Sequence, residues 1–154
     1  MKLAAVILFV LVLLMPAKLS AANTCPWLTE GTAAKALGGG VVPSAQISDS
    51  GEGFCTFSRE EGESTIALRV LVQKAAQPSC PASSPKLKGI GNEAVTCTMK
   101  RSAEESVEMI VSRVRELHFT VSITIHKRGP KSTDVELPKG GLEQVAEQVA
   151  GNLF

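Results

Sequence analysis

The stretch His118-Phe119-Thr120-Val121-Ser122-Ile123-Thr124-Ile125-His126 alternates apolar and polar side chains without a break. Successive side chains of a strand point to opposite faces, so this pattern predicts a strand with one buried face and one wet face. β-Branched and aromatic residues favour strands, and no Gly or Pro interrupts the run. The buried face, which needs a cover from elsewhere in the chain, is predicted to consist of Phe119, Val121, Ile123 and Ile125.

Two helices are predicted, one near each end of the chain. A short helix is expected from Glu30 to Leu37, with Thr29 as its N-cap and Gly38 as a left-handed stop. A C-terminal amphipathic helix is expected because apolar residues recur there at helical spacing. Its apolar stripe, which is the natural cover for the alternating strand, consists of Leu142, Val145, Ala146, Val149 and Leu153.

Several shorter strands are expected around the alternating one. Phe54 to Arg59 and Thr65 to Gln73 form a predicted hairpin, and Ala94 to Met99 form another strand. Residues 39–53 lack a period and are expected to be a surface connection, and residues 75–89 are expected to be a proline-rich loop. The predicted fold class is α+β, a mostly antiparallel sheet of about five strands with the N- and C-terminal helices packed on one face and the alternating strand inside the sheet.

Residues 102–117 fit two patterns. A helix is favoured by the capping-box sequence Ser102-Ala103-Glu104-Glu105 and by the helical spacing of Val107, Ile110, Val111 and Val114. A hairpin with the alternating strand is favoured if the chain reverses at Glu116-Leu117, because Val114 then lies opposite Phe119 and one face stays mostly apolar. We predict the hairpin.

Residues 1–22 have the features of a secretory signal peptide. Lys2 precedes an apolar run of 13 residues, too short to span a bilayer comfortably, and Ser20-Ala21-Ala22 supplies small residues at the cleavage site. Residues 23–154 are predicted to be a single secreted or periplasmic domain with no membrane span. Cleavage would remove two of the 16 basic residues and none of the 15 acidic ones, leaving a net charge of minus one that gives no indication of nucleic-acid binding.

The four cysteines are predicted to form two disulfides, because an even number of cysteines in an exported chain is typical of disulfide bonding. We expect Cys25 to pair with Cys55, which pins the first helix to the sheet, and Cys80 with Cys97, which ties the proline-rich loop to its own strand. A bond between Cys55 and Cys97 is the alternative. Zinc is disfavoured, since no C-x-x-C knuckle is present.

No group of residues specifies a reaction, and no cofactor or metal is expected. Gly89-Ile90-Gly91-Asn92-Glu93-Ala94 has the letters of a dinucleotide fingerprint, but no strand precedes it and a strand, not a helix, is expected after it. The two histidines lie about 26 Å apart along one strand, too far apart to share a metal. The candidate for binding is the polar strip on the wet face of the alternating strand, formed by His118, Thr120, Ser122, Thr124 and His126.

The order of several short motifs resembles a class of small exported bacterial proteins of unknown function, known chiefly as lipoproteins in actinobacteria. These motifs are Cys25-x-Trp27-Leu28-Thr29, Ala36-Leu37-Gly38, Cys55, the 89–94 sequence and Val145-Ala146-x-x-Val149. The chain departs from this class because it has no lipid-attachment cysteine. The resemblance implies a compact α+β domain and favours the hairpin, but it implies little about activity.

The leading functional prediction is a non-enzymatic extracytoplasmic binding or accessory domain with an envelope or extracellular partner. It follows from the predicted export, the disulfide-bonded fold and the lack of a recognisable catalytic constellation. The alternative is an inhibitor of a secreted or host hydrolase that presents a loop such as Gln77 to Lys88. A third hypothesis is a hydrolase with unrecognised catalytic residues.

Overall fold

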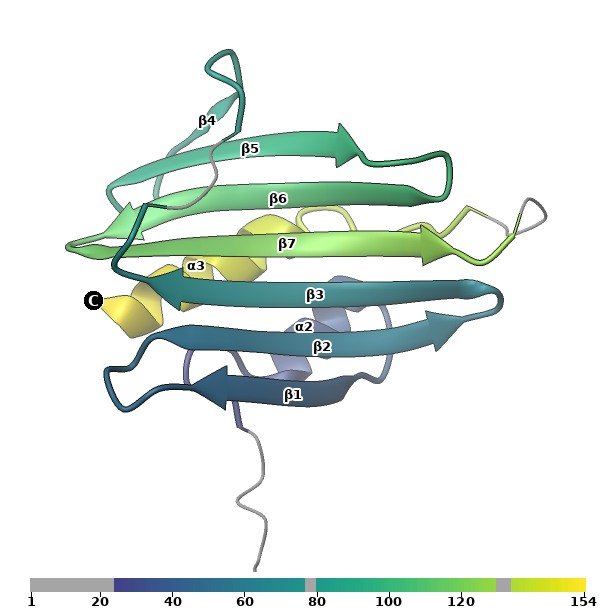
Figure 1. The fold of residues 1–154 in the computed structure, drawn as a ribbon, viewed down its shortest axis with the longest axis horizontal. Helices are drawn as coiled ribbons and strands as arrows, with labels where there is room; N and C mark the ends of the chain where they lie inside the picture. The colour runs from purple at the N-terminus through teal and green to yellow at the C-terminus, as the bar shows by residue number, and fades with distance from the viewer. Residues whose placement is uncertain (1–23, 77–79, 130–133) are drawn as a thin grey trace, which may run out of the picture.

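The alternating stretch forms β7 (Leu117–Lys127), which lies at the centre of the sheet in a computed structural model (Figure 1). The structure describes residues 24–76, 80–129 and 134–154, so the predicted signal peptide lies outside the described residues. The sheet has seven strands in the order β1-β2-β3-β7-β6-β5-β4, and every neighbouring pair is antiparallel. The other strands are β1 (Val42–Ile47), β2 (Gly53–Glu61), β3 (Ser64–Gln73), β4 (Lys86–Leu87), β5 (Glu93–Lys100) and β6 (Glu105–Val114).

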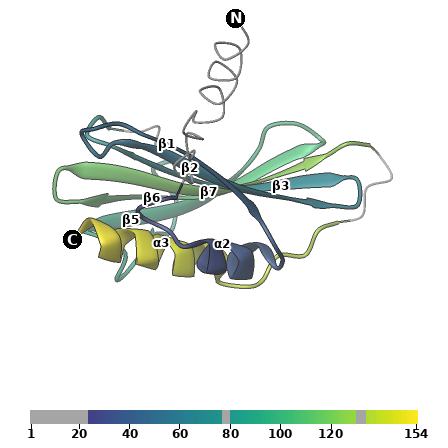
Figure 2. The ribbon, with the colours of Figure 1, turned by 90° about the horizontal axis from the view of Figure 1, so that it is seen from below.

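Both helices cover the same face of the sheet, as predicted (Figure 2). Helix α2 (Glu30–Leu37) begins after Thr29, whose Oγ1 accepts a hydrogen bond from the Thr32 N–H, and ends at Gly38 with φ +76°. Helix α3 (Gly141–Leu153) packs on β6 and β7 and against α2. The face of β7 predicted to be buried lies beneath these helices, in a core that also includes Trp27, Phe57, Leu68, Val70 and Ile110.

The region 102–117 forms a strand, which confirms the hairpin. The turn is one residue earlier than predicted, at Arg115-Glu116, so that Val114 pairs with Leu117 instead of Phe119. Arg115 adopts φ +54°, and a positive φ at the first central position is what the favoured two-residue hairpin turns require. The register changes by two residues, and the apolar face of the hairpin is therefore the same as predicted.

The prediction of about five strands was too low, because β1 and β4 were assigned to connections. β1 lies in residues 39–53, and as an edge strand it is largely exposed, so its sequence shows no alternation between core and solvent. β4 lies within residues 75–89 and has only two residues, too few to give a periodic signal. Both missed strands are at the edges of the sheet, where burial constrains the sequence least.

The disulfides join the predicted partners and lie on opposite faces of the sheet. Cys25 bonds to Cys55 with a Cα–Cα distance of 5.7 Å, and Cys80 bonds to Cys97 with a Cα–Cα distance of 5.8 Å. Cys55 pairs in register with the core residue Val70 and therefore faces the helices. Cys97 faces the other side, because it pairs in register with Met109, whose neighbour Ile110 is the one that points into the core.

Candidate functional site

Among the described residues no helix lies over the face of the sheet opposite α2 and α3, which is the face turned toward the viewer in Figure 1. Its four central strands contribute residues that are neighbours across the strands and far apart in sequence. One row across the sheet runs from Cys97 through Met109 and Ser122 to Arg69. The next row contains Val95, Val111, Thr120, Leu71 and Phe54.

A hollow of about 340 Å³ lies on this open face. We call it the open-face hollow, and its lining residues are Arg69, Leu71, Met99, Arg101, Met109, Thr120 and Ser122. Leu71, Met99 and Met109 give it an apolar floor, and methionine side chains adapt readily to differently shaped ligands. Two hydroxyls and two guanidinium groups add polar partners, so the hollow combines an apolar floor with hydrogen-bonding groups and positive charge.

The two arginines of the open-face hollow are held differently. The guanidinium carbon of Arg69 lies 4.4 Å from the centre of the Phe54 ring, a cation–π arrangement that orients the side chain over the sheet. Arg101 Nη1 forms an ion pair with Glu105 Oε1 at 3.2 Å. Among the described residues no carboxylate pairs with Arg69, so its positive charge is the one more available to an incoming anion.

The structure divides the predicted polar strip. Thr120 and Ser122 line the open-face hollow, whereas His118 lines a separate shallow hollow of about 150 Å³. Thr124 lies between Ala67 and Val107 outside the open-face hollow, and His126 is exposed at the far end of β7. Thr120 and Ser122, the middle of the strip, therefore belong to the candidate site, and the strip as a whole stays a prediction.

The apolar part of the site was not predicted. The wet side of the hairpin was expected to be mostly polar, but β6 places Val107, Met109 and Val111 on the open face, and Val107 is only 2% exposed. Leu71 could have been noticed, because strand alternation puts it opposite the core-facing Val70. Leu71 lines the same hollow as Met109 because β3, β7 and β6 are neighbours in the sheet, and no local sequence pattern specifies that order.

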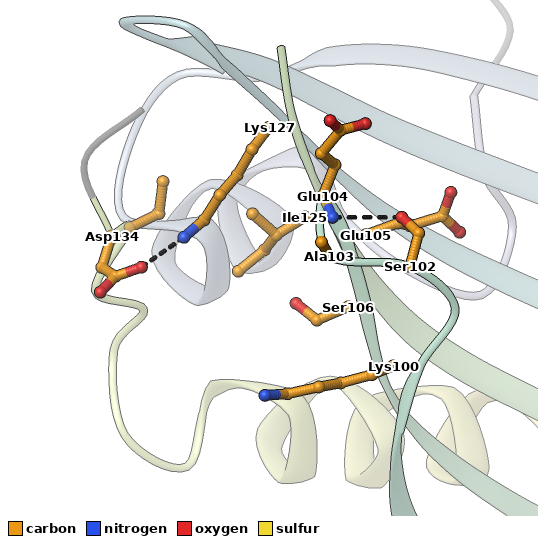
Figure 3. A pocket seen from close by; sticks show the side chains of 10 residues that line it. Lys100, Ser102, Ala103, Glu104, Glu105, Ser106, Ile125, Lys127 and Asp134 are labelled. Carbon is orange, nitrogen blue, oxygen red and sulfur yellow. Dashed lines mark hydrogen bonds and ion pairs between the residues drawn. The ribbon is translucent and has the colours of Figure 1, made fainter. Parts of the chain in front are cut away.

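A second hollow, also about 340 Å³, lies on the helix-covered side where β5, β6 and β7 approach the 134–135 segment (Figure 3). Two of its charged groups satisfy each other: Lys127 Nζ forms an ion pair with Asp134 Oδ1, which lowers the pKa of Asp134 through that hydrogen bond and the lysine charge. The Glu104 N–H donates to Ser102 Oγ at 3.1 Å. These contacts lie in the β5–β6 connection and at the end of β7. They indicate a structural role for this hollow.

A third hollow, of about 280 Å³, holds two carboxylates at the start of α3. Burial raises the pKa of Glu108, and the nearby negative charge of Glu143 raises it further. Glu143 is in the first turn of the helix, where the macrodipole favours a negative charge. Lys139 also lines this hollow, but the other described lining residues are glycine, proline, leucine and isoleucine, none of which can act as a nucleophile.

The 89–94 segment supports the β6–β7 hairpin. The Asn92 N–H donates to the Arg113 carbonyl at 2.7 Å, and Asn92 Oδ1 accepts from the Arg115 N–H at 3.0 Å. Ser112 Oγ donates to the Ile90 carbonyl at 2.9 Å in a buried position. The segment therefore fixes the turn with its own polar groups, and it leads into β5 instead of a helix, as expected for a glycine-containing turn.

The described residues contain no cluster of three or more His, Cys, Asp or Glu side chains that could hold a metal ion. Within the same part of the chain, neither helix has the length and apolar character needed to cross a bilayer. No protein-family model and no curated protein matches the sequence. The resemblance to the actinobacterial class therefore stays a prediction, and the open-face hollow is the candidate site on its geometry alone.

Proposed function

We propose that this protein is a non-enzymatic extracytoplasmic binding or accessory domain whose ligand docks in the open-face hollow. The observation that carries the proposal is an apolar floor of Leu71, Met99 and Met109 on a sheet face that neither of the two described helices covers. Burying apolar surface stabilises a complex by about 25 cal/mol per Å² before the costs of association. Two disulfides support an oxidising location, since such bonds persist outside the reducing cytosol.

The lining of the hollow favours a ligand with an apolar body and an anionic group. Met99 and Met109 would contact the apolar body, and the guanidinium of Arg69 would bind a carboxylate or phosphate through paired hydrogen bonds. The hydroxyls of Thr120 and Ser122 can donate or accept to fix its orientation. A long-chain carboxylate such as dodecanoate is the simplest probe of this chemistry.

Titration of the ¹⁵N-labelled protein with dodecanoate, followed by amide chemical shifts, tests the proposal. The largest shifts are expected at Thr120, Ser122 and Leu71, and a dodecyl trimethylammonium salt should bind more weakly because its charge is repelled by Arg69. Arg69→Glu should weaken dodecanoate binding by about tenfold, which corresponds to about 1.4 kcal/mol.

Lys100→Glu is the matched control, because it makes the same change in charge but lies at the helix-side hollow of Figure 3. It should leave dodecanoate affinity within about twofold, a difference of about 0.4 kcal/mol. Amide chemical-shift changes confined to residues on the helix-covered side would refute the assignment of the site. Equal losses of dodecanoate affinity in Arg69→Glu and Lys100→Glu would refute it too.

An inhibitor of a secreted hydrolase is the second candidate, and the anchoring of the loop after β3 favours it. Cys80 is bonded to Cys97, the Ser84 N–H donates to the Pro81 carbonyl at 2.9 Å, and the Thr96 N–H to the Pro85 carbonyl at 3.0 Å. These contacts hold the described part of the predicted loop, whose residues 77–79 lie outside the described residues. A rigid loop loses little entropy when it binds an enzyme cleft. Inhibition of a lysozyme or serine protease, without dodecanoate binding, would favour this candidate.

A further inference from the structure

The open-face hollow contains both methionines of the predicted mature chain. The sequence has four methionines, and two of them lie in the predicted leader. The other two, Met99 on β5 and Met109 on β6, both line this hollow. Met99 is two residues beyond Cys97, the residue that pairs in register with Met109, so the two methionines are diagonal neighbours on one face of adjacent strands. We call them the methionine pair.

Both side chains of the methionine pair are accessible to a small oxidant. Each is half-buried, and each borders a hollow on the sheet face that neither of the two described helices covers. A thioether is oxidised by a peroxide that can reach its sulfur atom. Other groups that a peroxide attacks are protected, because all four cysteines are bonded in disulfides and the one tryptophan, Trp27, is buried. A peroxide should therefore react first at the methionine pair.

Polar groups beside the methionine pair can bind the oxygen that oxidation would add. Ser122 pairs in register with Met109, and Arg69 pairs in register with Ser122. A sulfoxide oxygen accepts hydrogen bonds, and a hydroxyl or a guanidinium group can donate them. The described residues that line the hollow include no carboxylate that would repel this oxygen. The hollow is therefore compatible with the pair in both states, thioether and sulfoxide.

We propose that the methionine pair is an oxidant-sensitive modification site that controls the open-face hollow, and that its conversion to methionine sulfoxide by a peroxide releases the bound ligand. The inference rests on the proposed function, because it concerns the regulation of that binding site. In the reaction a lone pair of the methionine sulfur attacks one oxygen of hydrogen peroxide, and the O–O bond breaks. An S–O bond forms, the proton on the transferred oxygen passes to the departing hydroxide, and water leaves. The sulfur is oxidised and the peroxide is reduced.

Oxidation would weaken ligand binding in two ways. It turns two apolar side chains of the floor into polar ones, which leaves Leu71 as the apolar residue among those that line the hollow. The sulfoxide oxygen would also accept hydrogen bonds from Arg69 and Ser122, the donors that the anionic group of the ligand needs. A methionine sulfoxide reductase returns the thioether, so the change is reversible. The two disulfides support an oxidising location, where such a reaction can occur.

Treatment of the exported, leader-processed chain with hydrogen peroxide tests the modification, and a dodecanoate titration tests its effect. Peptide mapping should find one added oxygen atom on Met99 and one on Met109 while the chain is folded. The oxidised chain should bind dodecanoate about tenfold more weakly than the untreated chain, which corresponds to about 1.4 kcal/mol. Saturating dodecanoate should slow the oxidation, because it covers both side chains. Amide shifts of α3 should stay unchanged, which distinguishes a local loss of binding from unfolding.

Met99→Leu combined with Met109→Leu is the matched control, because the double variant has no thioether in the hollow and keeps side chains of similar volume. Its affinity for dodecanoate is measured before and after peroxide, and the two values should agree within about twofold whatever the starting affinity. Incubation of the oxidised wild-type chain with methionine sulfoxide reductases for both sulfoxide epimers should restore the affinity of the untreated chain.

The proposal is overturned if the oxidised chain binds dodecanoate as tightly as the untreated chain, or if peroxide weakens binding equally in the double variant. It is also overturned if the methionine pair reacts only after the chain has been unfolded. These outcomes leave the proposed function standing, because the untreated chain still binds dodecanoate. Failure of the untreated chain to bind dodecanoate would instead refute the proposed function, and the control by oxidation would fall with it.

Discussion

Replacing Gly91 with alanine measures how strongly the 89–94 segment supports the β6–β7 hairpin. Gly91 has φ +62°, and a Cβ atom there would lie 2.6 Å from the Arg113 carbonyl oxygen and 2.6 Å from Ser112 Oγ. The left-handed backbone costs a residue with a Cβ about 1 kcal/mol. Displacing the buried Ser112 hydroxyl from the Ile90 carbonyl adds about 2 kcal/mol. The free energy of unfolding should therefore fall by about 3 kcal/mol.

Gly89→Ala is the matched control, because Gly89 has φ +82° but a Cβ there would meet no atom within 4 Å. This substitution should lower the free energy of unfolding only by the backbone cost of about 1 kcal/mol. Guanidinium denaturation with the disulfides intact gives both values from the transition midpoints and a shared slope. Equal losses in the two variants would refute the close packing of Gly91 against β6, and a Gly91→Ala loss under about 1 kcal/mol would refute the energetic argument.

Glu108→Gln should stabilise the fold at neutral pH. Because the pKa of Glu108 is raised in the folded state, the wild-type chain loses stability as pH rises above the ordinary pKa of a glutamate. The difference in unfolding free energy between the variant and the wild-type chain should therefore vanish in acid. Persistence of the difference in acid would contradict this. Replacing both Cys25 and Cys55 with alanine should lower the unfolding free energy by about 3.5 kcal/mol, the chain-entropy value for a sequence separation of 30, as measured by denaturation without reductant. Asn92→Ala should cost about 1 kcal/mol in the same assay through loss of its hydrogen bond to the hairpin turn, and an unchanged midpoint would exclude that role.

The elements that bury one face were predictable from sequence, because burial imposes a period. The alternation around Phe119 located the central strand, and the helical stripe that begins at Leu142 located its cover. The capping residues also located the ends of one helix, since α2 begins after Thr29 and ends at Gly38 as predicted. The disulfide pairing could also be predicted, because each bond joins a cysteine in an irregular segment to a cysteine in a strand that the sequence already indicated.

The edges of the sheet and the open face could not be predicted in this way. β1 has little burial, so its six residues show no period, and β4 is too short to show one. The turn at Arg115-Glu116 was placed one residue too late, because a shift of two in register keeps every side chain on its own face. The open-face hollow combines Leu71 and Met109 from strands whose neighbours are set only by the tertiary order of the sheet.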